Sequence, residues 1–247
     1  MTMRSLHLGS AMIDIICIVS AEHIERMTFA NERTAFLMLE TGRKVPAESI
    51  TTHVGGGACN TATCLAHRGW ESAVVARTGK DLNADAVRAH LAAQGVDAAR
   101  LVGSAEAATG TAVMVASHDR NASIFVHRGA NEGLRPDDLD PAAVEGRDLV
   151  YIAPLSSGSA ACLGPAAAMG RKAGAMVAAN PGIRQLTGRR AEVLAALPAV
   201  DLLSVNRVEA EALIPAVVAA EGAEAELPPI PEDAPALLAR GLTSGGV

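Results

Sequence analysis

The sequence predicts an α/β fold in which a mostly parallel sheet is covered by helices on both faces. Short runs rich in Val, Ile and Leu alternate with Ala/Leu-rich helical stretches, which is typical of βαβ units. The runs at 149–152, 176–178 and 202–205 are almost continuously apolar, as strands buried on both faces are. With 247 residues, 49% of them hydrophobic, the chain has room for one large domain or two small ones around a buried core. We expect a single domain over 1–247.

The pattern assigns most of the chain to strands and helices in alternation. Strands are predicted at 6–8 running on towards 19, and at 73–76, 112–116, 124–126, 149–152, 176–178 and 202–205. Helices are predicted at 61–68, 84–94, 160–173, 191–196 and 209–213. Residues 215–235 carry five prolines and five acidic residues, which predicts a solvated surface loop.

Two segments do not fit a parallel sheet. Residues 45–54 alternate, with Ile50, Thr52 and Val54 on one side, and residues 111–127 have the pattern of a hairpin that turns through 117–121. Such half-exposed segments predict a small antiparallel flap added to the main sheet.

Composition excludes several function classes. The formal net charge is -6, no Lys/Arg cluster occurs and only five residues are aromatic, so nucleic acid is not expected as a partner. No apolar run is long enough for a transmembrane helix. The four cysteines form no C-x-x-C pair and are interpreted as buried small hydrophobes. Asp14 and Gly9-Ser10 interrupt the N-terminal apolar stretch, which argues against a signal peptide, and we expect a cytoplasmic protein.

The strongest local signal is the glycine-rich turn Gly55-Gly56-Gly57-Ala58-Cys59-Asn60, between a strand-like run and a helical one. Glycines there let the backbone approach a ligand closely, and the helix start offers N–H groups and Asn60 to a hydroxylated or anionic molecule. No Gly-Lys-Ser/Thr follows, so this is not a P-loop. A tight connection without a ligand explains the same residues.

Two further polar signals follow apolar strands. Asp14 is a lone carboxylate in an apolar run; if it ends the first strand, it faces the crevice where open α/β sheets bind ligands. Asn206 and Glu209 follow the strand at 202–205, and their spacing places both on one face of a starting helix. They are candidates for holding hydrated Mg²⁺ or a phosphate-bound water network, but a helix cap with a capping-box Glu requires the same spacing.

These motifs together resemble the PfkB-type, ribokinase-like carbohydrate kinases. The resemblance lies in Gly9-Ser10…Asp14, Gly55-Gly56…Asn60, Thr109-Gly110-Thr111-Ala112, Arg128-Gly129-Ala130-Asn131, Asn180-Pro181-Gly182 and Asn206-x-x-Glu209, in family order. It implies a three-layer α/β/α fold with a small β-lid, formed here by about 17–54 and 111–128. The family transfers phosphate from ATP to a sugar hydroxyl with Mg²⁺, and its lid often mediates homodimer contacts.

The resemblance also implies roles for single residues. Asp14, Gly55, Gly56 and Asn60 would bind substrate hydroxyls, with the glycine pair as a lid hinge. Asn206 and Glu209 would organise the ATP phosphates and Mg²⁺, the ion being held by Glu209 through water. Met12, two residues before Asp14, is more similar to fructokinases and nucleoside kinases than to ribokinases. We therefore expect a sugar such as fructose, with a nucleoside such as adenosine as the alternative.

One part of the family pattern is not in this sequence. The Thr-x-Gly-x-x-Gly turn and the Gly-Ala-Gly-Asp motif, whose Asp is the family's catalytic base, are absent from residues 1–247. By resemblance, on the order of 60 residues are missing at the C-terminal end. No catalytic base is therefore assigned, and a non-catalytic sugar-binding remnant is a further alternative.

Overall fold

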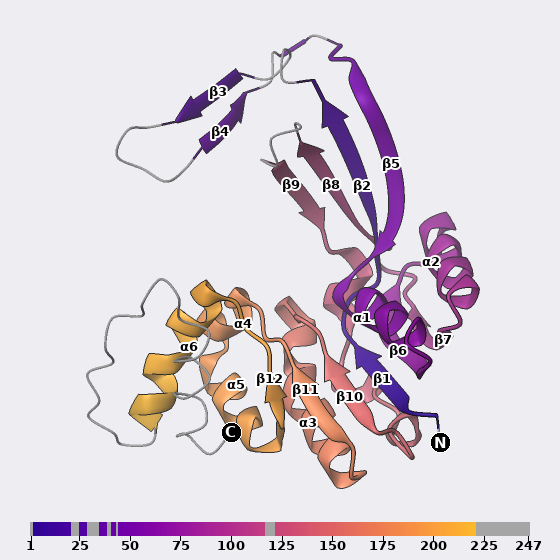
Figure 1. The fold of residues 1–247 in the computed structure, drawn as a ribbon, viewed down its shortest axis with the longest axis vertical. Coiled ribbons are helices and arrows are strands. Elements are labelled where there is room, and N and C mark those ends of the chain that lie inside the picture. The colour runs from indigo at the N-terminus through magenta and orange to yellow at the C-terminus, as the bar shows by residue number, and fades with distance from the viewer. Residues whose placement is uncertain are drawn as a thin grey trace.

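The computed structural model describes residues 2–20, 25–28, 35–38, 41–42, 44–116 and 122–220; for 25–28, 35–37 and 218–220 it describes the backbone alone. The described chain contains a six-stranded sheet surrounded by helices and a four-stranded sheet that projects away from them (Figure 1). The expected turn at 117–121 and most of the expected loop at 215–235 lie outside the described residues.

The six-stranded sheet is parallel throughout, as the sequence predicts, and β1 lies in its interior. The strand order is β12 (Leu202–Leu203), β11 (Met176–Ala179), β10 (Leu149–Ile152), β1 (Arg4–Leu8), β6 (Glu71–Thr78) and β7 (Asp97–Gly103). The chain fills one side of β1 with β6 and β7 before it fills the other with β10, β11 and β12.

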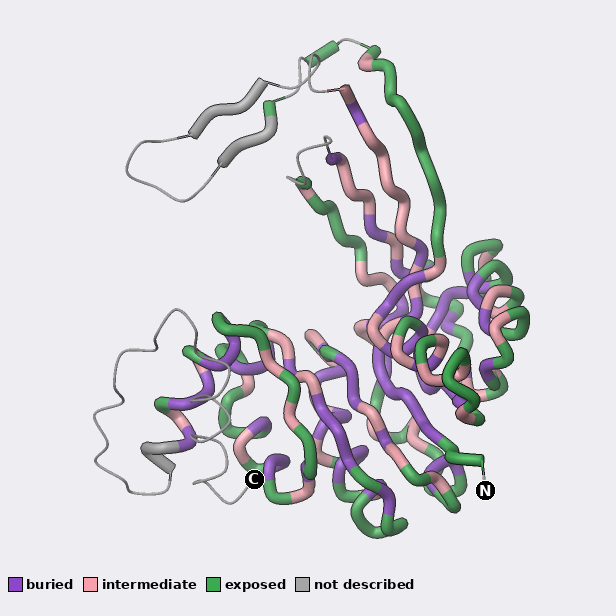
Figure 2. The backbone as a smooth tube through the Cα atoms, viewed as in Figure 1, coloured by how far each residue is buried: buried purple, intermediate pink, exposed green. Residues whose placement is uncertain are grey.

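Helices cover both faces of this sheet, which gives the predicted three-layer α/β/α arrangement. Strand β6 shows it directly, because Ala73 and Val75 belong to one apolar cluster and Val74 and Ala76 to the other. Both sets are buried, and the central strands are buried along most of their length (Figure 2). One face is covered by α1 (Gly57–Ala66) and α2 (Leu82–Ala93), and the other by α3 (Leu163–Lys172), α4 (Ile183–Gly188), α5 (Arg190–Ala196) and α6 (Arg207–Ala220).

The four-stranded sheet contains both segments in which the sequence predicts antiparallel strands. Its order is β5 (Ala47–Gly55), β2 (Met12–Val19), β8 (Gly110–Ala116) and β9 (Ala122–His127). The β2–β8 pair is parallel, and the two outer pairs are antiparallel. Between β2 and β5 the chain forms the hairpin of β3 (Glu25–Thr28) and β4 (Ala35–Met38).

Several local predictions were wrong at the ends of elements. The helix expected from 61 begins at Gly57, because Gly56 can adopt the turn that precedes it. Strand β7, which was not predicted, lies at the edge of the sheet and alternates weakly in polarity. The expected loop from Pro215 begins later, since α6 runs to Ala220 with Pro215 on its exposed side. Here the packing of Leu213 and Val217 outweighs the cost of the proline.

Three burial predictions also need correction. Strand β12 was expected to be buried, yet it is two residues long and Leu202 is exposed, because β12 is the sheet edge. Cys64 is exposed on α1, whereas Cys59 and Cys162 are buried as expected. Along β5 both sides are exposed over the first seven residues, so Ile50 and Thr52 share a side that nothing covers in the described chain.

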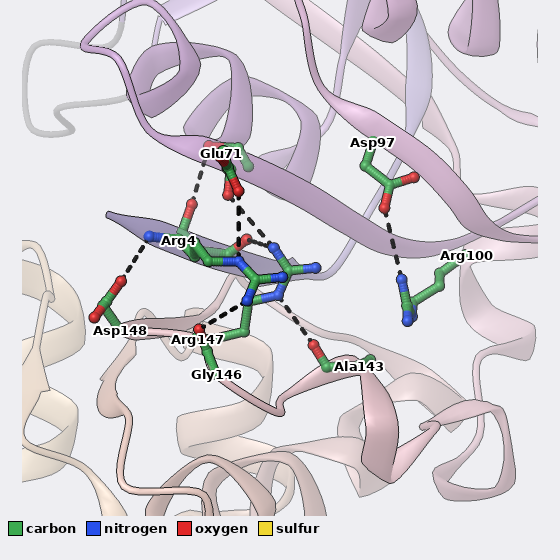
Figure 3. Close-up of polar contacts among 10 residues, drawn as sticks. Arg4, Glu71, Asp97, Arg100, Ala143, Gly146, Arg147 and Asp148 are labelled. Carbon is green, nitrogen blue, oxygen red and sulfur yellow. Dashed lines mark hydrogen bonds and ion pairs between the residues drawn. The ribbon is translucent and has the colours of Figure 1, made fainter. Parts of the chain in front are cut away.

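A charge network joins the amino ends of the parallel strands. The Arg4 backbone N–H donates to Asp148 Oδ2 (2.7 Å), and the Arg4 guanidinium lies 3.5 Å from the Glu71 carboxylate. Arg147 donates to the backbone carbonyl oxygens of Ser5 and Glu71 (Figure 3). Burial, followed by the charges of Arg4 and Arg100, lowers the pKa of Arg147. This network therefore lies at the amino end of the sheet, opposite to the carboxyl edge where ligands are expected.

A buried polar chain crosses the layer between β1 and α1. His7, 1% exposed, lies between Thr61 Oγ1 at 2.8 Å from its Nδ1 and Ser5 Oγ at 2.9 Å from its Nε2. Thr61 donates to the Gly57 carbonyl (2.8 Å), so Nδ1 of His7 is the donor and Nε2 the acceptor. Burial, with a smaller contribution from Arg147, lowers the pKa of His7 to about 4.

We expect the stability of the protein to fall on acidification because of His7. Its folded pKa of about 4 is below the ordinary histidine value of 6.5, so between these pH values the unfolded chain binds more protons. The free energy of unfolding should be highest above pH 6.5 and lose about 3 kcal/mol down to pH 4. Urea unfolding across this range measures the effect.

His7→Gln should flatten this pH dependence, whereas His67→Gln, which changes an exposed histidine, should not. An equally steep dependence in His7→Gln would mean that another group titrates.

Candidate active site

The carboxyl ends of the parallel strands form one edge, and the strand order reverses there between β1 and β10. Ligands of open α/β sheets bind at such a switch point. A small hollow of about 40 Å³ lies at this place, and we call it the switch-point hollow. It is lined by Gly9, Ser10, Met12, Arg128, Asn131, Pro154, Leu155, Ser156 and Ser159.

Asp14 is carried by the four-stranded sheet and not by the end of the first strand. The chain leaves β1 after Leu8, crosses at residues 9–11 and starts a new strand, so Asp14 is the third residue of β2. The expectation that it ends the first parallel strand is therefore wrong. The chain cannot run straight on because Gly9 packs against Ala153, whose Cβ would lie 2.7 Å from a Cβ at residue 9.

The Asp14 carboxylate lies directly against Gly55. A Cβ built on Gly55 would be 1.9 Å from Asp14 Oδ2, so no other residue fits at position 55 without moving the carboxylate. Burial raises the pKa of Asp14, and the charge of His53, its partner across β2 and β5, opposes this. No hydrogen-bond donor of the described chain satisfies this half-buried carboxylate. Asp14 therefore has acceptor capacity left for the hydroxyls of a ligand.

Gly56 is the second glycine that the geometry requires. Its φ is 98°, and an added Cβ would lie 2.3 Å from the carbonyl oxygen of Ser10. The next amide, of Gly57, donates to Ser10 Oγ (3.0 Å), and the Asn60 amide donates to the Gly56 carbonyl (2.9 Å). The structure thus brings Asp14, Gly55 and Gly56 together. Asn60 follows within the first turn of α1, with its side chain exposed.

Asn131 holds the crossing between the two sheets. Its Oδ1 accepts from the Ala11 amide (2.9 Å) and its Nδ2 donates to the Ala11 carbonyl (2.9 Å). A Cβ on Gly110 would lie 2.4 Å from Asn131 Nδ2, so Gly110 leaves the space for this side chain. We call this region, where all passages between the sheets meet, the junction; it comprises Ser10, Ala11, Gly55–Gly57, Ala108–Gly110 and Arg128–Asn131.

Asp81 fixes the approach to β8, a role that sequence reasoning missed. It accepts from the Thr109 hydroxyl (2.6 Å) and amide (2.8 Å), and it caps α2 through the Ala84 amide (2.9 Å). Desolvation acts to raise the pKa of Asp81, but these hydrogen bonds outweigh it and the pKa is lowered. Thr109 in turn accepts from the Gly79 amide. Asp81 and Thr109 are 28 residues apart in the sequence. No local pattern could therefore indicate that they are in contact.

Asn206 and Glu209 form a reciprocal capping box at the start of α6. Asn206 Oδ1 accepts from the Glu209 amide (3.0 Å), and Glu209 Oε2 accepts from the Asn206 amide (2.9 Å). They follow β12, whose next residue, Ser204, accepts a hydrogen bond at its carbonyl from Asn180, the residue after β11 (2.6 Å). The structure places them at the same carboxyl edge as the switch-point hollow but not in contact with Asp14, Gly55 or Gly56.

Two kinds of feature are not found in the described part of the chain. It contains no group of three or more His, Cys, Asp or Glu side chains that could hold a metal ion. None of its helices is both long enough and apolar enough to span a membrane.

A parallel α/β core that carries a projecting four-stranded sheet beside its switch point defines a ribokinase-like fold. The family model "pfkB family carbohydrate kinase" matches residues 8–229, and the chain belongs to this family. No curated protein matches the chain.

Solved structures share the fold at low sequence identity. The chain is similar to ribokinase of Arabidopsis thaliana complexed with ribose and ATP (TM-score 0.70, 20% identity, covering 100% of this chain and 69% of that one). It is also similar to a PfkB protein from Polaromonas sp. JS666 (TM-score 0.71, 18% identity, covering 100% of this chain and 74% of that one). A third similar structure is fructokinase with bound ATP from Xylella fastidiosa (TM-score 0.67, 16% identity, covering 99% of this chain and 70% of that one).

The glycines of the junction should tolerate alanine poorly. Gly56→Ala places a Cβ at a positive φ and against the Ser10 carbonyl, so we expect a loss of about 2 kcal/mol in the free energy of unfolding. Gly188→Ala is the matched control: it ends α4, is not in the left-handed region and has nothing within 4 Å, so it should change the free energy of unfolding by less than about 1 kcal/mol. Equal effects of the two changes in urea unfolding would contradict the assigned geometry.

Proposed function

We propose that this protein transfers the γ-phosphoryl group of ATP to a hydroxyl of a small sugar. The observation that carries the proposal is the half-buried Asp14 carboxylate, which lies against Gly55 at the junction and accepts no hydrogen bond from the described part of the chain. Membership of a carbohydrate kinase family supports it. A carboxylate accepts hydrogen bonds from two vicinal hydroxyls, which suits a polyol.

The four residues around the turn would divide the recognition of the sugar. Asp14 accepts from hydroxyls, while Gly55 and Gly56 let the backbone come close to the sugar ring. Asn60, exposed in the first turn of α1, offers an amide that both donates and accepts. Positioning of this kind is a large part of catalysis in phosphoryl transfer.

Asn206 and Glu209 would serve the nucleotide side. Glu209 is 9% exposed, and one of its carboxylate oxygens caps α6, so the other is the atom left for a water ligand of Mg²⁺. A single carboxylate with water and phosphate ligands fits the way proteins hold this ion. When bound, Mg²⁺ neutralises phosphate charge. No catalytic base is assigned, since residues 1–247 contain no Gly-Ala-Gly-Asp segment.

The four-stranded sheet would be the lid of this site. It contains both ends of the segment 17–54, most of the segment 111–128 and the start of β2, and it is connected to the core through the junction. Closure over the sugar would exclude water from the reacting phosphate. Its outer strands expose Ile50, Ile124 and Phe125, which supports a homodimer formed through this sheet.

A second candidate function is sugar binding without phosphoryl transfer. In this function the same substrate-side residues, Asp14, Gly55, Gly56 and Asn60, hold a sugar and transfer no phosphate. Calorimetry with sugars and with ATP, together with an assay of ADP release, distinguishes the two functions.

Asp14→Ala should abolish most of the function. Loss of two hydrogen bonds to a charged acceptor predicts a fall of at least about 100-fold in kcat/KM for the sugar, or in sugar affinity if there is no turnover. A coupled assay of ADP release over a panel of sugars measures the first quantity. Asp137→Asn, at an exposed position, is the control and should change neither. Undiminished turnover in Asp14→Ala would remove Asp14 from the site.

A further inference from the structure

A second and larger cleft, of about 580 Å³, opens beside the switch-point hollow. It is lined by the end of β9, by the short helix at residues 129–133 that follows it, and by α4. We call it the arginine cleft. Its polar lining comes mainly from His127, Arg128, Glu132 and Arg184, and Ile124 and Val126 complete one wall. The two arginines come from segments far apart in the sequence, so local patterns could not have joined them.

Arg128 and Arg184 differ from the other arginines of the described chain. Every other arginine whose side chain is described, from Arg4 in β1 to Arg207 in α6, donates to a carboxylate, a carbonyl oxygen or a thiol, or, as Arg100 does, forms an ion pair with a carboxylate. Arg128 and Arg184 have no such partner within the described part of the chain. Arg128 is half-buried and Arg184 is exposed, so both guanidiniums are open to the cleft that they line and can take an anionic ligand there.

The charge of the cleft is not neutralised by its own lining. Glu132 is its one acidic residue, and its Oε1 already accepts from the Ser157 hydroxyl (2.8 Å). His127 lies on the same wall as Arg128 and adds a further potential donor. An anion entering the cleft would therefore meet an excess of donors.

Both arginines stand on backbone that is held in place. The Arg128 carbonyl accepts from Asn131 Nδ2 (3.1 Å), the same side chain that holds Ala11 in the junction. Arg184 precedes Gln185, which is 2% exposed and whose Oε1 accepts from the Leu155 amide (2.9 Å). Fixed backbone reduces the entropy lost when a guanidinium binds an anion, as a preorganised site requires.

Arg128 also connects this cleft to the candidate sugar site. It lines the switch-point hollow together with Ser10 and Met12, and Met12 is two residues from Asp14 in β2. A ligand whose hydroxyls reach Asp14 could thus place a charged group between the two arginines. Asn206 and Glu209 line neither the hollow nor the cleft, which separates the arginines from the proposed nucleotide residues.

We propose that the substrate is an anionic sugar, a sugar acid or a sugar phosphate, whose carboxylate or phosphate is bound by Arg128 and Arg184. This inference rests on the proposed function, because it names the class of sugar that the same site takes. Guanidinium groups bind carboxylate and phosphate with two parallel N–H···O bonds, so neutral sugars and nucleosides would leave both arginines unpaired.

The test is calorimetric titration of the full chain with matched ligands: gluconate against glucose, and fructose 6-phosphate against fructose. At least one anion should bind about 10-fold or more tightly than its neutral counterpart, and which pair responds distinguishes carboxylate from phosphate. Arg184→Gln should weaken binding of that anion by about 10- to 100-fold and leave binding of the neutral sugar unchanged. Arg128→Gln should weaken binding of the anion by a similar factor. Arg128→Lys and Arg184→Lys should lose less, because they keep the charge.

Arg189→Gln is the matched control, because Arg189 pairs with Glu192 outside the cleft. This change should not alter the affinity for any of the ligands. Thermal unfolding of each variant shows whether it folds, and loss of anion affinity on adding KCl provides a second readout on the unaltered chain. Neutral sugars that bind as tightly as the anions would overturn the inference and leave the proposed function standing. If the arginine variants weaken only the binding of ATP, the arginines belong to the nucleotide site and the inference is overturned. If no sugar binds at all, both proposals are overturned.

Discussion

The junction is the constraint on which the rest of the structure depends. Every passage between the two sheets runs through it, and the backbones there approach more closely than side chains allow. Gly55 accommodates the Asp14 carboxylate, Gly56 the Ser10 carbonyl and Gly110 the Asn131 amide. The paired hydrogen bonds of Asn131 to Ala11 then join the segment after β9 to the start of β2. A Cβ at these glycines would separate elements that the site needs together.

This arrangement gives each sheet its own part of the proposed chemistry. The parallel core supplies the carboxyl edge, where strand order reverses and where Asn206 and Glu209 begin α6. The projecting sheet supplies Asp14 and leads into Arg128. Because the hydroxyl acceptor belongs to the projecting sheet, movement of that sheet about the junction would carry the acceptor towards or away from the edge. Sugar binding and closure would then be one event rather than two.

The core of the fold could be predicted from the sequence, whereas the meeting of distant residues could not. Buried parallel strands such as 149–152 and 176–179 are apolar throughout, and that pattern is local. The capping box of Asn206 and Glu209 is also local, so the three-residue spacing allowed it to be predicted as one of two alternatives. The position of Asp14 depends on a crossing at residues 9–11, and α6 continues past Pro215 because of tertiary packing. The arginine cleft joins Arg128 to Arg184 through the fold alone.

The central claim is that one ligand is held at the junction by Asp14 and the glycine turn. Hydrogen–deuterium exchange of the full chain, with and without a saturating sugar or sugar acid that binds it, tests this most directly. If Asp14 and the glycine turn hold the ligand, its binding should slow exchange in peptides that cover 9–16, 53–60 and 126–132. Protection confined to the amino-end network around Arg147, with no change at the junction, would contradict it.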